Sequence, residues 1–177
     1  MARDPSRPAE AQAREWLAAQ LNAGIALPLQ RDARGRPHLA APFDAFDASW
    51  SHSGKHLLVA LARGARVGVD VEWVQPKRRL RAIAERYFTV AEQAWLEASR
   101  DPVTAFHRLW CAKEAVLKAH GHGLAFGLDR LEFTEAATGA LQLTTADPDL
   151  GKATAWRLRE WVPEPGYRAA LAWRPRD

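Results

Sequence analysis

The chain of 177 residues can build one hydrophobic core, or one core from two small halves, but not an independent second domain. Its composition, 47% hydrophobic and 26% charged with a single cysteine, is that of an ordinary globular protein and excludes extended disorder and an intramolecular disulfide. The net charge of +4 and the pI near 9.6 favour an anionic partner, but scattered arginines without a compact basic run argue against nucleic acid.

Targeting and membrane signals are absent from the sequence pattern. The N-terminus has no charged and apolar leader, and no apolar run approaches the roughly 20 residues that a membrane span needs. Together with the unpaired Cys111, this predicts a cytoplasmic protein that does not engage a membrane.

The N-terminal third is expected to hold one helix and one buried strand. Residues Ala9 to Asn22 are strong helix formers followed by Gly24. The stretch from Gln30 to Pro37 is turn-like, the stretch from Pro42 to Ala48 is irregular, and Leu57 to Ala62 reads as a buried strand.

A period-two pattern follows Gly64. Val67, Val69 and Val71 alternate with Gly68, Asp70 and Glu72, so the valines share one face of a strand and the two carboxylates share the other.

The rest of the chain is expected to form helices and then an antiparallel meander. Helices are predicted over 77–86, over 89–98 with Thr89 as N-cap and Glu92 completing a capping box, and over 103–120 before Gly121. Strands are predicted over 130–134, 140–144, 153–161 and 167–173. This order predicts an α+β fold rather than a doubly wound parallel sheet.

Asp70 and Glu72 are the first candidate site. Two carboxylates on one strand face suit Mg²⁺, which is commonly held by one or two carboxylates together with phosphates and water. Gly68 on the same face would leave room for a phosphate group. A solvated acidic face on an edge strand is the alternative interpretation.

The second candidate site is on the predicted helix over 103–120. The i, i+4, i+8 spacing of Trp110, Glu114 and Lys118 places these residues on one face of that helix. An ordinary surface ion pair between Glu114 and Lys118 is the alternative.

The third candidate is the segment WSHSG, from Trp50 to Gly54. A histidine between small hydroxyl residues suits a phosphate at a turn, and a serine-rich turn with a solvated histidine is the alternative. His52 and His56 do not suggest zinc, because further Cys or His ligands are missing from the sequence around them.

In this order the three motifs resemble those of the surfactin-type (Sfp-like) 4′-phosphopantetheinyl transferases. The resemblance runs from about Arg34 to Phe133 and also includes Gly35-Arg36-Pro37, the segment from Tyr87 to Glu92, Lys113 and Gly121 to Leu124. It implies a pseudo-twofold fold of two related halves, 1–65 and 66–177, each with a small antiparallel sheet packed by helices and with the active site between them. A faint echo between His56–Gly64 and Tyr167–Pro175 agrees with such halves.

The resemblance also implies residue roles. Asp70, Glu72 and Glu114 would hold Mg²⁺, Lys118 would contact phosphate, and Arg36, Ser51 and His52 would contact the nucleotide end of coenzyme A, His52 at its 3′-phosphate. Glu92 has a counterpart near the site, so a capping role and a coenzyme A-binding role compete. Cys111 lies off the Glu114 face and is interpreted as helix packing.

The activity implied is Mg²⁺-dependent transfer of 4′-phosphopantetheine from coenzyme A to a serine of an apo acyl or peptidyl carrier protein, with 3′,5′-ADP released. Catalysis would rest on Asp70, Lys118 and Glu114, with Glu114 or a metal-bound water as the base. Carrier proteins of this kind are acidic, which suits the basic balance, and the segment from Val74 to Tyr87 is the expected docking surface.

The chain departs from the family in being short, with an abbreviated N-terminal region. Basic contacts to the 3′-phosphate from that region are not matched, and Arg14 or Arg31 would have to substitute. The length favours a monomer. The alternative function is a non-catalytic coenzyme A or nucleotide-binding protein on the same fold.

Overall fold

The N-terminal half of the chain forms one helix and two antiparallel hairpins. The computed structural model describes residues 1–24, 27–76 and 79–176. Helix α1 (Ala9–Gln20) packs on the hairpin of β3 (Phe46–Ser53) and β4 (His56–Arg63), while β1 (Leu29–Arg31) pairs with β2 (Pro37–Leu39). Leu17, Leu39 and Ala48 are the buried centre of this half.

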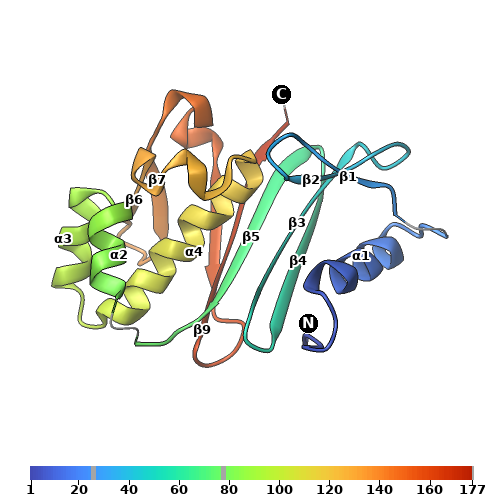
Figure 1. Cartoon of the computed structure of the whole chain (residues 1–177). Helices are drawn as coiled ribbons and strands as arrows, with labels where there is room; N and C mark the ends of the chain where they lie inside the picture. Colours follow the sequence, from blue (N-terminus) through green and yellow to red (C-terminus); the bar gives the residue numbers. More distant parts are fainter. Residues whose placement is uncertain (25–26, 77–78, 177) are drawn as a thin grey trace.

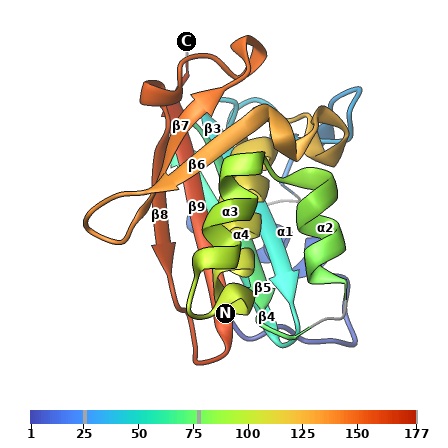
Figure 2. The same ribbon diagram turned by 90° about the vertical axis from the view of Figure 1, so that its left-hand side faces the viewer.

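The second half surrounds the long helix α4 (Pro102–His120). Its strands are β5 (Ala65–Trp73), β8 (Arg157–Trp161) and β9 (Tyr167–Pro175), antiparallel in the order β5-β9-β8, and the separate hairpin of β6 (Leu131–Glu135) and β7 (Leu141–Ala146). Helices α2 (Leu80–Tyr87) and α3 (Val90–Ala98) and the β6–β7 hairpin pack around the outer side of α4, as Figure 2 shows.

Helix α4 is fixed at both ends by residues that suit its termini. Asp101 caps its start by accepting from Thr104 N (3.0 Å), and Pro102 occupies the first turn, where a missing N–H costs nothing. Gly121 ends the helix with a φ of 98°, a left-handed conformation that glycine adopts without strain. The apolar side chains of α4 pack into a buried cluster that α2, α3, β6, β7 and β9 share, so this helix is held firmly on several sides.

The two halves meet where β3 lies beside β5 (Figure 1). The main chains of these strands do not pair in the described structure; instead, side chains of β3 bond to the edge of β5, as when Asp47 Oδ2 accepts from Val67 N (2.7 Å). Asp70 and Glu72 on β5 therefore lie at this seam between β3 and β5.

The predicted α+β class, with small antiparallel sheets packed by helices, is confirmed. The strand over 67–71 and the helices over 9–22, 89–98 and 103–120 are confirmed within a few residues at their ends. The helix expected over 77–86 begins at Leu80 where the structure describes it, and residues 77 and 78 lie outside the described residues. Among the described helices, none combines the length and apolar character that a membrane span requires.

Three local predictions were wrong in part. Residues 46–48 are not irregular but begin β3, because Phe46 and Ala48 point into the N-terminal core. The segment from Gln30 to Pro37 is only partly a turn, since its ends belong to β1 and β2. The strand expected from Ala153 begins at Arg157, and Ala153–Ala155 is a single 3₁₀ turn.

Candidate functional site

Close approach of α4 to β5 builds the site. A Cβ on Gly68 would lie 2.0 Å from Ala115 O and 2.5 Å from Ala119 N, so only glycine allows the helix backbone to lie on the strand. The expectation that Gly68 leaves room for a phosphate is therefore wrong, because α4 itself fills that space. As a consequence, Asp70, which lies two residues further along β5 on the same face, meets the helix face that carries Glu114 and Lys118. We call Asp70, Glu114 and Lys118, with Glu72, the acidic group.

Asp70 is the centre of this group. Its Oδ1 accepts from Ser51 Oγ (2.7 Å) and from Lys118 Nζ (2.6 Å), and its side chain is 4% exposed. Its other oxygen, Oδ2, is buried and accepts no hydrogen bond from any residue that the structure describes. A buried carboxylate oxygen without a donor is costly unless a further group binds it.

Glu114 repeats this feature from the helix. It is 8% exposed, and its Oε1 is buried with no donor among the described residues. Burial, reinforced by the charge of Asp70 and opposed by that of Lys118, raises the pKa of Glu114 to about 7. The side chain therefore changes charge near neutral pH.

The third predicted metal ligand, Glu72, is half-buried and accepts from Ser53 Oγ (3.1 Å). Across residues 1–24, 27–76 and 79–176, no three His, Cys, Asp or Glu side chains are arranged as a group that could hold a metal ion. The donor chemistry nevertheless fits Mg²⁺, because two hard oxygens lack partners and this ion is commonly bound by one or two carboxylates with substrate phosphates. These residues therefore suit Mg²⁺ only as part of a site in which the phosphate groups of a substrate supply the remaining ligands.

A basic groove adjoins the acidic group. It has a volume of about 250 Å³ and lies between the β1–β2 hairpin, β3 and the end of α4. Its basic lining residues are Arg31, Arg34, Arg36 and Lys118. Arg36 is nearly buried, donating to Asp47 Oδ2 (2.6 Å) and to Lys118 O (2.9 Å), so its main role in this structure is to join the hairpin to α4. Arg31 pairs with Glu10 at the groove, whereas Arg14 pairs with Glu10 from α1 and does not line it.

Ser51 and His52 lie in β3 rather than in a turn, which corrects the interpretation of WSHSG; only Gly54, with a φ of 53°, belongs to the bend. Ser51 and Ser53 point toward β5 and hydrogen-bond to polar groups there, so their polarity does not indicate a loop. His52 is exposed, and partial burial followed by the charges of Arg3 and Lys118 lowers its pKa. The imidazole of His52 is therefore mostly neutral at pH 7 in the free protein.

Glu92 belongs to a different place. It is fully buried and completes the predicted capping box, accepting from Thr89 N (2.9 Å) while Thr89 Oγ1 accepts from Glu92 N (3.3 Å). Its oxygens also accept from Lys113 Nζ (2.7 Å) and Phe133 N (2.9 Å). The capping role is confirmed, and the structure does not bring Glu92 to Asp70 and Glu114.

Cys111 is 1% exposed, and its thiol donates to Arg168 O (3.5 Å). Burial, then the charges of Asp70 and Glu72, raises its pKa well above the usual range, so it stays a thiol and packs as predicted.

Asp47 is a buried polar residue that the motifs missed, and its Oδ1, like one oxygen each of Asp70 and Glu114, accepts no hydrogen bond from a described residue. It joins Arg36 to Val67 N and is fully buried, and the signal that could have revealed it is the alternation of polar residues at 47, 49, 51 and 53.

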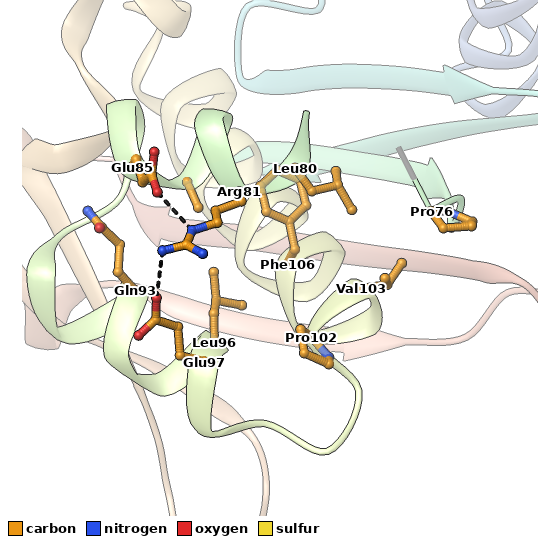
Figure 3. Close-up of a pocket in the computed structure, with 11 residues that line it drawn as sticks. Pro76, Leu80, Arg81, Glu85, Gln93, Leu96, Glu97, Pro102, Val103 and Phe106 are labelled. Atoms are coloured by element: carbon orange, nitrogen blue, oxygen red, sulfur yellow. Dashed lines mark hydrogen bonds and ion pairs between the residues drawn. The ribbon is translucent and has the colours of Figure 1, made fainter. Parts of the chain in front are cut away.

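A second groove, of about 360 Å³, is separate from the acidic group. Figure 3 shows it between α2, α3 and the start of α4, lined mainly by apolar side chains such as Leu80, Leu96 and Phe106. Arg81 bridges Glu85 (2.9 Å) and Glu97 (3.8 Å) at its edge.

Comparison with known families agrees with the motifs. The sequence model described as the 4′-phosphopantetheinyl transferase superfamily matches residues 66–172. The 4′-phosphopantetheinyl transferase HetI of Nostoc sp. is 34% identical over 155 residues, which cover 82% of this chain and 62% of that protein. The human L-aminoadipate-semialdehyde dehydrogenase-phosphopantetheinyl transferase is 36% identical over 117 residues, 59% of this chain and 38% of that protein. The chain thus spans less than two thirds of the length of these curated relatives.

Solved structures share the fold. The holo-[acyl-carrier-protein] synthase of Neisseria meningitidis superposes with a TM-score of 0.53 at 23% identity, over 62% of this chain and 97% of that chain. At that identity the likeness establishes the architecture, and the chemistry has to be argued from the residues above.

Proposed function

Because the chain belongs to the 4′-phosphopantetheinyl transferase superfamily, we propose that it transfers 4′-phosphopantetheine from coenzyme A to a serine of an apo acyl or peptidyl carrier protein. The observation that carries this proposal is the pair of buried carboxylates, Asp70 and Glu114, which come from different elements and each keep an oxygen without a donor. Lys118 stands beside them at the end of a basic groove. Carrier proteins of fatty acid, polyketide or peptide synthesis are the substrate class.

The proposed Mg²⁺ ligands are Asp70, Glu114 and Glu72. Because no three acidic side chains among the described residues are already grouped around one point, the pyrophosphate of coenzyme A would have to complete the site, and the ion would neutralise its charge. Lys118 already donates to Asp70 Oδ1, so its ammonium group is held where phosphate oxygens would arrive. A fixed cation at that position stabilises charge that grows on those oxygens in the transition state.

Glu114 is the proposed general base. In the metal-free protein burial raises its pKa to about 7, and a bound cation would lower that pKa, so the deprotonated carboxylate, the form that can take the serine proton, is the one expected at neutral pH in the complex. In the transfer, the serine oxygen bonds to the β-phosphorus, the bond from that phosphorus to 3′,5′-ADP breaks, and the serine proton passes to Glu114. The reaction needs no covalent enzyme intermediate.

The basic groove is the proposed site for the nucleotide end of coenzyme A. Arg31 and Arg34 are exposed at this groove, and His52 lies on the adjacent strand. A phosphate next to His52 would favour the protonated imidazole, against the lowered pKa of the free protein. Arg36 would contribute by holding the β1–β2 hairpin against α4, and Ser51 by its hydrogen bond to Asp70.

The groove of Figure 3 is the proposed docking surface for the carrier protein; the segment from Val74 to Tyr87 forms one side of it, and α3 and the start of α4 form the other. Its apolar lining suits a protein partner, and Arg79 and Arg86, which are exposed on the same segment outside the groove lining, would attract an acidic one, as carrier proteins of this kind are. Arg79→Glu with Arg86→Glu should raise the KM for the carrier and leave the KM for coenzyme A unchanged; equal effects on both would refute the docking surface.

We expect a cytoplasmic monomer with one site between the halves 1–65 and 66–177. The seam of β3 and β5, which crosses this boundary, supports such a site.

The test is the intact mass of apo carrier proteins after incubation with the protein, coenzyme A and Mg²⁺. The expected result is a mass gain of one phosphopantetheine. This gain should disappear when a chelator is added, and it should also be absent with a Glu114→Ala protein that is shown to be folded by its thermal unfolding curve. No gain on a panel of acyl and peptidyl carriers, with coenzyme A still bound, would instead identify a non-catalytic binding protein.

A further inference from the structure

Strand β3 is joined to β5 by side chains instead of a main-chain ladder. Its alternating polar residues Asp47, Ser49 and Ser53 accept from Val67 N (2.7 Å), Val69 N (3.2 Å) and Trp73 N (3.0 Å). The three bonds keep a constant offset of 20 residues, so β3 runs parallel to β5 with one side chain between their backbones. This arrangement satisfies N–H groups of β5 that would otherwise lack partners.

Two hydroxyls of this series make a different kind of bond. Ser51 Oγ donates to Asp70 Oδ1 (2.7 Å), although the offset of the series would place it opposite Val71. Ser53 Oγ accepts from Trp73 N and at the same time donates to Glu72 Oε2 (3.1 Å). Both acidic side chains of β5 therefore take a hydrogen bond from β3.

The bond to Asp70 determines which of its oxygens is left over. Ser51 and Lys118 both donate to Oδ1, so the buried Oδ2 keeps its lone pairs for another group. The bond from Ser53 likewise restricts the rotation of Glu72, and its main-chain anchor at Trp73 N holds the serine itself in place. Partners that orient a carboxylate without touching the cation commonly determine how tightly the cation is bound.

We propose that Ser51 and Ser53 are positioning residues, which orient Asp70 and Glu72 of β5 toward a divalent cation from the other half of the chain. This inference rests on the proposed function, because it assumes that Asp70 and Glu72 hold that cation. It assigns to β3 a role in cation binding, beyond the contact with coenzyme A that the family resemblance implies for Ser51.

A purely structural role for these serines makes a different prediction. Ser49 offers the matched control, because its hydroxyl accepts from Val69 N in the same seam, and this bond is to main chain rather than to an acidic side chain. Ser49 also lines the basic groove, so its variant is compared at coenzyme A concentrations that saturate each protein. If the serines only join the strands, Ser49→Ala and Ser53→Ala should have the same consequences. If they position the carboxylates, only Ser51→Ala and Ser53→Ala should change cation binding.

The experiment measures Mn²⁺ binding directly, without turnover, by the electron paramagnetic resonance signal of the free ion during titration of the full-length protein with coenzyme A present. Mn²⁺ is the probe because it shares the preference of Mg²⁺ for carboxylate and water oxygens. Thermal unfolding and coenzyme A affinity without metal are measured for each variant, and Ser53→Thr tests whether restoring the hydroxyl restores binding.

The expected result is a rise of about tenfold in the Mn²⁺ dissociation constant for Ser51→Ala and Ser53→Ala. Ser49→Ala should bind Mn²⁺ like the wild type even where it melts earlier, and Ser53→Thr should recover most of the affinity. Equal Mn²⁺ affinity for the Ser49→Ala and Ser53→Ala proteins would overturn the inference. In that case, Mn²⁺ binding by the wild-type protein would still leave the proposed function standing. A wild-type protein that binds no Mn²⁺ would overturn both.

Discussion

Helix α4 carries two lysines, five residues apart, in opposite environments. Lys113 is fully buried and bonds to Glu92 (2.7 Å) and to the carbonyl oxygens of Leu128 and Leu131. Lys118 is 29% exposed and bonds to Asp70 (2.6 Å), beside the unpaired oxygen of Glu114. All three hydrogens of the Lys113 ammonium group have acceptors within the protein. Lys118, by contrast, lies in a group in which one oxygen of Asp70 and one of Glu114 accept no hydrogen bond from a described residue.

This difference separates a structural ion pair from a site prepared for a ligand. Burial lowers the pKa of Lys113, and Glu92 opposes that effect, so the pair holds α3, α4 and the start of β6 together without free capacity. Around Lys118 the buried carboxylates outnumber the cation, an imbalance that costs stability and that a proton on Glu114 or a further positive group would relieve. Sequence similarity treats both lysines alike, since both fall in the same motif.

The largest effect is expected from Lys113→Met. Removing the ammonium group leaves Glu92 as a buried, unpaired charge, which should lower the free energy of unfolding by about 3–5 kcal/mol. Chemical denaturation measures this. The double variant Lys113→Met with Glu92→Gln should recover part of the loss, and a single variant as stable as the wild type would contradict the structural assignment.

Lys118→Met should have the opposite profile. We expect transfer to carrier protein to fall by about 10²–10³-fold, since a fixed cation next to the phosphoryl oxygens is lost. Stability should fall less than in Lys113→Met, because Lys118 is partly exposed. Rates from intact mass and denaturation curves on the same preparation decide this, and a loss of stability as large as that of Lys113→Met would remove the contrast between the two lysines.

Glu114 should make stability depend on pH when no divalent cation is present. The pKa of its carboxyl is raised to about 7 in the folded protein, so the folded state retains a proton that the unfolded state releases from about pH 4.5 upward. The unfolding free energy should therefore fall between these pH values and stay low above them, by about 3 kcal/mol relative to Glu114→Gln. Unfolding of both proteins at pH 4, 6 and 8 measures this; parallel pH profiles would show that Glu114 is not the cause.

The smallest effect is expected at His52. Burial and the charges of Arg3 and Lys118 lower the pKa of its imidazole, and a bound 3′-phosphate should raise that pKa again. Coenzyme A affinity should accordingly weaken as the pH rises through that value. Proton NMR titration of His52 with coenzyme A, and with 3′-dephospho-coenzyme A as control, tests the contact; an identical response to both ligands would place the 3′-phosphate elsewhere.

The two strands at the seam show how far prediction from sequence reached. β5 was predicted because valines alternate with Gly68, Asp70 and Glu72, and a strand with one apolar face has an evident core to join. β3 has the same alternation, but its polar residues are Asp47 and three serines, which are typical of turns. Their partners are on β5, about 20 residues away, so no local pattern could identify them as strand residues.

The acidic site was predicted with similar unevenness. Gly68 was expected to leave room for a phosphate group, and this prediction was wrong because the backbone of α4 occupies that space. Glu92 could have served capping or binding, and only the packing of α3 on α4 brought it to Lys113. A conformational preference at one residue does not say which distant element will use it.

The sequence by itself determined the helices, the valine face of β5 and the identity of the acidic and basic side chains, because hydrophobic periodicity, capping residues and glycine positions act over a few residues. The tertiary structure alone decided that Asp70 meets Glu114 and Lys118, that Ser51 and Ser53 turn toward the acids, and that Glu92 does not. Those outcomes depend on which faces pack together and on which buried polar atoms find donors, and both are set by contacts between residues far apart in the chain.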